Sequence, residues 1–223
     1  MLRLDRGHRY RGRIFDAEKA ELLLEAGNFG ENYAPTRNIV VADIDNDGDI
    51  DILITNRGRQ NEICLNDGRG SFNQTLPFGG LDDSTIDVEA ADMNGDGFKD
   101  LVLANRDGQQ NYIYLNNGRL SFVEKIPFGS GKDNTRSVAI SDLNGDSYPD
   151  IVSANVGEAN RIYWGDEGHT YSRSVVFDTS ASNSSSLSIA DFNLDGEEDI
   201  VIGNFRETNH VFINQNSIIM MEV

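Results

Sequence analysis

The chain has 223 residues, and its 37 acidic and 19 basic side chains give it a formal net charge of −18 at pH 7. This acidity excludes nucleic acid as the main partner, because phosphate binding needs a basic surface, and the lone cysteine, Cys64, excludes an internal disulfide. Hydrophobic residues make up 38% of the chain, which argues against disorder, and no apolar stretch reaches the roughly 18 residues of a membrane helix, so we expect no membrane insertion.

A tandem repeat organises most of the sequence. Four similar acidic segments (DIDNDGDID, DMNGDGFKD, DLNGDSYPD and DFNLDGEED) begin at Asp43, Asp92, Asp142 and Asp191, which are 49, 50 and 49 residues apart. A threonine or serine stands seven residues before each first aspartate, and an asparagine stands thirteen residues after it. Because so many offsets are fixed, the segments belong to copies of one structural unit.

Each unit is predicted to form four short β-strands. In the third unit, runs rich in Val, Ile and Tyr occupy 137–141, 150–154, 161–164 and 171–177, and Asn, Asp and Gly clusters separate them. No unit has room for a helix of ordinary length. Four strands in a period of roughly 40–50 residues are typical of a propeller blade. The predicted fold is therefore an all-β propeller of four-stranded antiparallel blades, with a β-solenoid or β-sandwich array as the less favoured alternative.

We expect a single domain, 1–223, in which four full blades follow a partial one. Its predicted parts are a partial first blade at 1–35 and blade repeats at 36–84, 85–134, 135–183 and 184–223. Within the partial blade, the composition of 16–27 favours a short helix, whereas the register of the repeat favours strands, which we adopt. At the other end, 217–223 occupies the place of a fourth strand but lacks the Phe and Gly expected there.

The acidic loops predict calcium sites. Positions 1, 3, 5 and 9 of each loop carry oxygen-bearing side chains, and the backbone carbonyl at position 7 is a natural further donor. Carboxylates that converge on a tight loop repel one another unless a cation neutralises them, and Ca²⁺ accepts roughly six to eight oxygen ligands, whereas Mg²⁺ prefers more water. The loops contain no His or Cys, which disfavours zinc and copper. The expected ligands are Asp43, Asp45, Asp47, Asp49 and Asp51; Asp92, Asn94, Asp96, Phe98 and Asp100; Asp142, Asn144, Asp146, Tyr148 and Asp150; and Asp191, Asn193, Asp195, Glu197 and Asp199.

EF-hand loops share this opening pattern but need a Glu at position 12 and flanking helices. Position 12 is Ile54, Leu103, Ser153 or Ile202, each inside a predicted strand, so the EF-hand interpretation fails. A lone acidic loop is about as often a solvated turn as a metal site, but four in register indicate up to four Ca²⁺ ions. The third loop is the weakest, because Ser147 stands where the other loops have glycine.

These features resemble the FG-GAP repeats, also called VCBS repeats, of the class that includes the integrin α-subunit β-propeller. The resemblance rests on the FG pairs at 29–30, 78–79 and 128–129, on the acidic loops and on segments such as 56–68, and it covers about residues 24–216. It implies structural calcium on the lower face of a propeller. The predicted calcium sites themselves lead us to expect an extracellular, periplasmic or cell-surface location, because structural calcium sites are normally filled outside the cytosol. Propellers of this family commonly close with more blades, so the chain is expected to be a fragment, a small propeller or an arc completed by another chain.

Function is expected on the face opposite the acidic loops. Strand polarity places the Asn-rich loops there, at 56–61, 105–111, 155–160 and 204–209. Convergent loops on a rigid scaffold are common binding sites, so we expect a non-catalytic adhesion scaffold for an unidentified protein or glycan. The recurring Asn side chains are expected to serve the backbone. Less regular arginines are better candidates for contacting an acidic group or a sugar: Arg37, Arg57, Arg106, Arg136 and Arg206.

The alternative function is a propeller-based carbohydrate-active enzyme resembling a polysaccharide lyase, or a fragment of one. Catalysis of that kind needs a general base and a general acid close together. The three histidines, His8, His169 and His210, lie in different units and have no neighbouring carboxylate or Tyr pattern that suggests a pair. We therefore predict no catalytic residue.

A further interpretation is self-association through the incomplete end blades. Residues 1–13 carry five arginines against one aspartate, whereas the rest of the chain is strongly acidic. A basic first blade and an acidic last blade would suit head-to-tail pairing. The simpler interpretation is a basic strand edge that blocks aggregation.

Overall fold

The computed structural model describes residues 27–30, 34–180 and 183–215. These residues form fifteen β-strands arranged in four antiparallel sheets. The described part contains no helix, and accordingly none that could span a membrane. The predicted strand-or-helix segment at 16–27 lies outside the described residues, apart from its last residue, and the predicted last strand at 217–223 lies outside them entirely.

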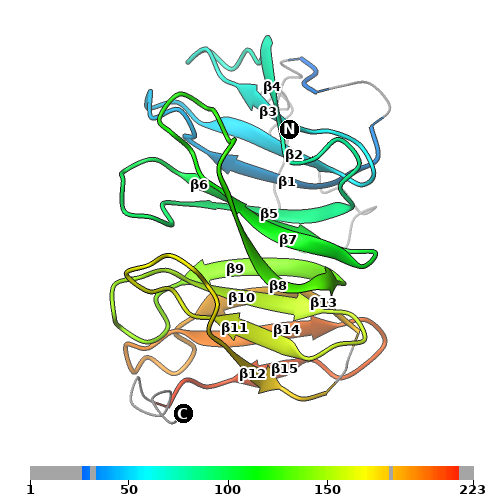
Figure 1. Ribbon diagram of the computed structural model, residues 1–223, viewed down its shortest axis with the longest axis vertical. Helices are drawn as coiled ribbons and strands as arrows, with labels where there is room; N and C mark the ends of the chain where they lie inside the picture. The colour runs from blue at the N-terminus through cyan, green and yellow to red at the C-terminus, as the bar shows by residue number, and fades with distance from the viewer. Residues whose placement is uncertain (1–26, 31–33, 181–182, 216–223) are drawn as a thin grey trace, which may run out of the picture.

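Each sheet is built from one copy of the repeat (Figure 1). The first contains β1 (Thr36–Ala42), β2 (Asp51–Asn56), β3 (Asn61–Leu65) and β4 (Gln74–Phe78), and the second contains β5 (Thr85–Ala91), β6 (Asp100–Asn105), β7 (Gln109–Tyr114) and β8 (Lys125–Asp133). The third contains β9 (Thr135–Ser141), β10 (Asp150–Asn155), β11 (Asn160–Tyr163) and β12 (Ser174–Asp178), and the fourth contains β13 (Ser184–Ala190), β14 (Asp199–Asn204) and β15 (His210–Phe212). Strands adjacent in sequence are adjacent in each sheet, which is the up-and-down order of a propeller blade. The predicted all-β fold of antiparallel blades is confirmed.

Hydrophobic cores fill the space between successive blades. Strand β6 shows how its sequence achieves this, because Leu101 and Leu103 pack into the core shared with the first blade. Their neighbours Val102 and Ala104 pack into the core shared with the third blade. All four side chains are fully buried, so the strand needs an uninterrupted apolar run instead of an alternating one.

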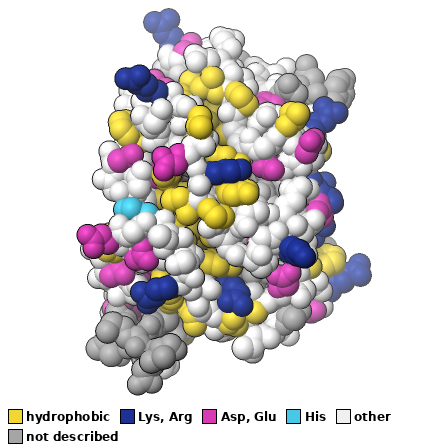
Figure 2. All heavy atoms as spheres, viewed as in Figure 1, with side chains coloured by type: hydrophobic (Ala, Val, Ile, Leu, Met, Phe, Trp, Pro, Cys, Tyr) yellow, Lys and Arg dark blue, Asp and Glu magenta, His cyan; other side chains and the backbone are white. Residues whose placement is uncertain are grey.

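The two outer faces of the array are less covered. Ile39 and Val41 of β1 are 49% and 63% exposed, and Val211 of β15 is 55% exposed. In Figure 1 the first two blades occupy the upper half of the array, and the third and fourth overlap in the lower half. On the side shown in Figure 2, hydrophobic side chains form a band along the middle of the array, and charged side chains scatter around it. The described residues are thus an arc of blades with two free faces.

A chain of polar side chains links the blades along the face opposite the acidic loops. The amide Nδ2 of an asparagine at the start of the third strand donates to the first hydroxyl of the next blade. The pairs are Asn61 to Thr85 at 2.9 Å, Asn111 to Thr135 at 2.8 Å and Asn160 to Ser184 at 2.9 Å. In each blade the strand register shifts just after this hydroxyl residue. The recurrent hydroxyl and asparagine therefore serve as joints between blades, and we call this chain the polar relay.

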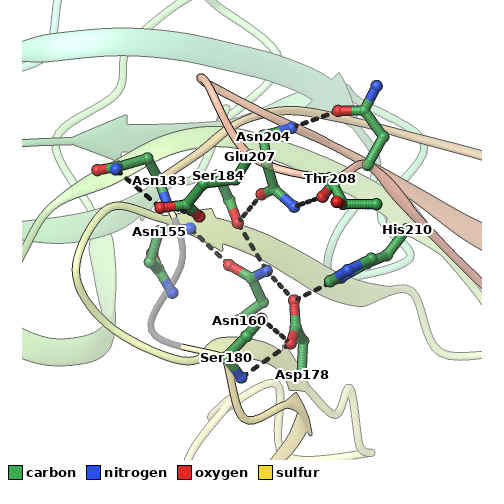
Figure 3. Close-up of polar contacts among 11 residues, drawn as sticks. Asn155, Asn160, Asp178, Ser180, Asn183, Ser184, Asn204, Glu207, Thr208 and His210 are labelled. Carbon is green, nitrogen blue, oxygen red and sulfur yellow. Dashed lines mark hydrogen bonds and ion pairs between the residues drawn. The ribbon is translucent and has the colours of Figure 1, made fainter.

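The junction between the third and fourth blades shows the polar relay in detail (Figure 3). Asn160 Oδ1 accepts the backbone N–H of Asn155 at 2.8 Å, and Asn160 Nδ2 also donates to Asp178 Oδ2 at 3.0 Å. The Ser184 hydroxyl donates onward to Asn204 Oδ1 at 2.8 Å. These asparagines serve the backbone, as the sequence pattern predicts, and they also join neighbouring blades. One link is incomplete, because Asn105 Oδ1 is buried without a hydrogen-bond partner among the described residues.

Replacing Asn160 by alanine is expected to lower the free energy of unfolding by about 2–4 kcal/mol, because three buried groups, the Asn155 N–H, the Asp178 carboxylate and the Ser184 hydroxyl, each lose a hydrogen bond. Asn209 is the matched control, since it stands at the same repeat position, is exposed, and only accepts the N–H of Asn204. Asn209→Ala should cost about 1 kcal/mol or less. Urea denaturation of both variants measures the difference, and equal losses would contradict a joint between blades.

Candidate functional site

The four acidic loops each connect the first strand of a blade to the second. Their backbones are alike, because positions 4 and 6 adopt positive φ in every loop. Position 6 is glycine in three loops, and Ser147 adopts the same conformation in the third, with φ of 72°. The predicted weak point is thus built like the other loops, with a side chain where left-handed backbone favours glycine.

The first aspartate of each loop accepts hydrogen bonds from the backbone of the turn. Its Oδ1 accepts the N–H of position 5 and its Oδ2 the N–H of position 6. In the second loop these are Asp96 and Gly97, at 3.2 and 2.8 Å from Asp92. The other first aspartates, Asp43, Asp142 and Asp191, repeat both contacts. The four loops therefore share one hydrogen-bonded conformation.

The side chains at positions 1, 3 and 9 converge in the first loop. Each of Asp43, Asp45 and Asp51 offers a carboxylate oxygen, and these oxygens lie within 4.8 Å of one another. Burial, and then the charges of Asp51, Asp47 and Asp43, raises the pKa of Asp45 against the opposing hydrogen bond from the Asp47 N–H. In the other loops position 3 is an asparagine, whose Nδ2 donates to the position 5 aspartate at 2.7–3.1 Å. None of the ion pairs of the described residues involves a loop carboxylate.

The aspartate at position 9 is fully buried in every loop. Its Oδ2 accepts the N–H of position 2, and its Oδ1 accepts an N–H from the loop after the third strand. The two distances are 3.0 and 2.9 Å for Asp51, 2.9 and 2.7 Å for Asp100, 3.0 and 2.8 Å for Asp150, and 2.9 and 2.8 Å for Asp199. Each of these carboxylates holds two loops together and keeps a second lone pair on each oxygen for a cation.

Two of these buried carboxylates have strongly raised pKa values. Burial raises the pKa of Asp100 to about 6, and the charges of Asp96 and Asp92 add to the effect while backbone hydrogen bonds oppose it. Burial likewise raises the pKa of Asp150 to about 7. A nearby cation would favour the ionised form of both groups.

The first three acidic loops also contact the next blade through position 2, whereas Phe192 of the fourth loop is 51% exposed. Ile44, Met93 and Leu143 are at most 3% exposed and belong to the three cores between blades. Their carbonyl oxygens accept hydrogen bonds from the following blade, which come from Asn116 Nδ2, Tyr171 Oη and Asn214 Nδ2 at 3.0–3.3 Å. The loops are therefore corners within a blade and joints between blades.

Four of the five predicted arginines gather on the opposite face, and one aspartate, Asp107, pairs with two of them. Arg57 approaches Asp107 Oδ2 through Nε at 3.1 Å and Nη2 at 2.9 Å, and Arg106 Nε lies 2.9 Å from Asp107 Oδ1. Burial, and then the charges of Arg106 and Arg57, lowers the pKa of Arg136, while Asp107 opposes and Arg37 adds to the shift. We call these four arginines the arginine cluster. The fifth, Arg206, lies instead over the ring of Phe205, 5.0 Å from its centroid.

The sequence missed two local arrangements. Asp107 occurs at no equivalent position in the other units, so the repeat pattern gave no signal for it. His210 lies 3.9 Å from the Asp178 carboxylate, which corrects the expectation that no described histidine has a carboxylate neighbour. Asp178 stands where other units have the glycine of the FG pair. His169 packs 6.0 Å from the Tyr148 ring, and His8 lies outside the described residues.

Solved structures resemble the chain in fold. Two crystal structures of BBS1N in complex with ARL6DN, one soaked with lead and one with mercury, are each 14% identical to it, with TM-scores of 0.53 and 0.50. Both matches cover 77% of this chain, which spans only about half of BBS1N, 51% and 48% respectively. The Vibrio cholerae biofilm matrix protein Bap1 is 20% identical over 74% of this chain and 23% of its own, with a TM-score of 0.45. At these identities the likeness concerns the fold alone. A search of curated protein sequences finds no match.

The family is identified by the repeats themselves. The model of the FG-GAP-like repeat matches three overlapping segments, 43–103, 92–153 and 142–202. Each matched segment begins at the first aspartate of one acidic loop and extends past the next loop. Together they span most of the described blades. The chain belongs to the FG-GAP-like repeat family.

Proposed function

We propose that the chain is a calcium-binding propeller module, located outside the cytosol, that presents the face opposite its acidic loops to a protein or glycan partner. The observation that carries the calcium proposal is the convergence of Asp43, Asp45 and Asp51 within 4.8 Å without an ion-pair partner among the described residues. The shared backbone conformation of the other three loops extends the proposal to them.

The donor set fits a hard cation. Side-chain oxygens at positions 1, 3, 5 and 9 would hold the ion, together with the carbonyl at position 7, in all four loops. Bound calcium would supply the positive charge that offsets the repulsion among these carboxylates. The chain's own residues fix the loop, because the position 1 and position 9 aspartates are already bonded to the backbone. An ion that binds only the folded loop stabilises the fold.

The binding role is supported by the place of the arginine cluster. Arg57 and Arg106 directly follow β2 and β6, whereas the acidic loops directly precede these strands. The two features therefore lie at opposite ends of the blades. The solved BBS1N structures are complexes with ARL6DN, which agrees with a partner-binding role for a propeller of this kind.

We propose a non-catalytic role. The two described histidines occupy separate places, His169 beside Tyr148 and His210 beside Asp178. The Asp178 carboxylate is 5% exposed and already accepts the Asn160 amide, which suits a structural contact better than proton transfer. A carbohydrate-active enzyme remains the alternative, and turnover of a polysaccharide by the purified chain would establish it.

Calcium is expected to raise the melting temperature of the chain relative to excess chelator. Each site filled at a hundredfold excess over its Kd adds about 2.7 kcal/mol to the free energy of unfolding. The double variant Asp92→Asn with Asp96→Asn should lose the part of the calcium-dependent stabilisation that comes from the second loop. Asp82→Asn, an exposed change outside the loops, should retain all of it. Identical melting curves in calcium and chelator would sink the structural-calcium proposal.

A partner screen checks the binding role directly. Glycan and protein arrays probed with the calcium-loaded chain should return a ligand whose binding falls when chelator is added, because the loops order the blades that carry the surface. A ligand that binds equally well without calcium would show that partner binding does not depend on the calcium sites.

Ser147→Gly is expected to stabilise the third loop by up to about 1 kcal/mol. A non-glycine residue in left-handed backbone costs about 1–2 kcal/mol, and the greater freedom of glycine in the unfolded chain returns about 0.5–1 kcal/mol of this. The reverse change in the fourth loop, Gly196→Ser, should destabilise, since Gly196 has φ of 94°. Urea denaturation with and without calcium measures both, and a loss of stability in Ser147→Gly would contradict the shared loop conformation.

A further inference from the structure

The arginine cluster gathers positive charge from three blades on one face of an acidic protein. Arg37 and Arg136 are the second residues of β1 and β9, and Arg57 and Arg106 directly follow β2 and β6. Asp107, the carboxylate that contacts the cluster, is bonded by two of the four arginines. The whole chain has a net charge of −18, but locally these four positive charges repel one another, and a single aspartate balances only part of that repulsion.

Two guanidinium groups of the cluster have no partner within the part of the chain that the structure describes. Arg37 is exposed and Arg136 is partly buried, and among the described residues neither makes a hydrogen bond or an ion pair. A partly buried guanidinium beside like charges is costly to leave unpaired. An anionic group from outside the chain would supply the missing partner.

The contacts of Asp107 show that the spacing of Arg57 and Arg106 suits a carboxylate. Its two oxygens accept the N–H groups of Arg57 and Arg106 at 2.9–3.1 Å, within the ordinary range of N–H to oxygen hydrogen bonds. Burial tends to raise its pKa, but hydrogen bonds from Ser84 and Arg57 and the charges of both arginines hold the pKa below its ordinary value. The cluster is thus already arranged to bind carboxylates.

The small area of the positive charge favours a short acidic ligand over a long polyanion. A long polyanion, such as a sulfated polysaccharide, would reach past the cluster onto the neighbouring loops of the same face, which carry Asp82, Glu158 and Glu207, and be repelled there. A short acidic segment confines its charge to the area of the cluster. Arginine is also the residue that best matches carboxylates by paired hydrogen bonds.

We propose that the arginine cluster is the site at which this module binds an acidic segment of a partner protein, through carboxylates that pair with Arg37 and Arg136. This rests on the proposed function, because it names the chemistry of the ligand on the face opposite the acidic loops. Asp107 then acts as an internal competitor that occupies Arg57 and Arg106 until the segment binds.

Fluorescence anisotropy with calcium-loaded protein tests the site. The probe is a labelled peptide with three consecutive glutamates, and the same peptide with glutamines is its control. The glutamate peptide should bind and the glutamine peptide should not. The double variant Arg37→Gln with Arg136→Gln should weaken binding at least about tenfold, which corresponds to about 1.4 kcal/mol. Arg206→Gln, on the same face outside the cluster, should leave binding unchanged.

Asp107→Asn gives an opposite prediction. Asparagine tolerates the left-handed backbone of this position, where φ is 62°, and it frees two arginines from their charged partner. The variant should therefore bind the glutamate peptide several-fold more tightly. Weaker binding would mean that Asp107 only positions the arginines, and it would overturn the competitor role.

Three other results would overturn the site as a whole. They are equal binding of the two peptides, unchanged binding in the double arginine variant, or binding of a sulfated oligosaccharide but not of the glutamate peptide. If these occur while calcium still raises the melting temperature, the acidic-ligand inference fails and the calcium module stands. If calcium leaves the melting temperature unchanged, the proposed function itself fails.

Discussion

The structure depends on four fully buried carboxylates, one at the ninth position of each acidic loop. Each accepts one backbone N–H from its own loop and another from the loop after the third strand, at 2.7–3.0 Å. A buried carboxylate is costly unless it is bonded or neutralised. These bonds hold each blade together at one end, and they also confine negative charge where a cation would relieve it.

The blades are joined by different kinds of contact at their two ends. At the acidic end, apolar side chains such as Ile44 and Met93 enter the cores between blades, so the conformation of a loop and the packing of its neighbour are linked. At the opposite end the polar relay joins the blades through uncharged Asn and hydroxyl groups. In the arginine cluster at this end, Arg57 and Arg106 pair with Asp107, and among the described residues Arg37 and Arg136 have no hydrogen-bond or ion-pair partner. Calcium binding at one end would therefore support a binding surface at the other.

The repeat pattern predicted the all-β blades, and the structure confirms them. Fixed offsets identified the strands, the acidic loops and the asparagines, because each recurs and each has a local physical reason. The pattern failed where a feature occurs once. Asp107 and the contact between His210 and Asp178 have no counterparts in the other blades, and each involves a residue from a distant part of the chain, Arg57 for Asp107 and Asp178 for His210. The links made by Asn160 and its equivalents also needed the structure, since their partners lie 24 residues away in the next blade.

Isothermal titration calorimetry of the metal-free chain with calcium shows whether the acidic loops bind the ion. We expect saturable binding with a stoichiometry of up to four ions, and loss of one ion when the carboxylates of a single loop are replaced. The third loop, which carries Ser147, should contribute the weakest site. Absence of saturable binding, or a stoichiometry that loop substitutions do not change, would contradict the assignment of the acidic loops as calcium sites.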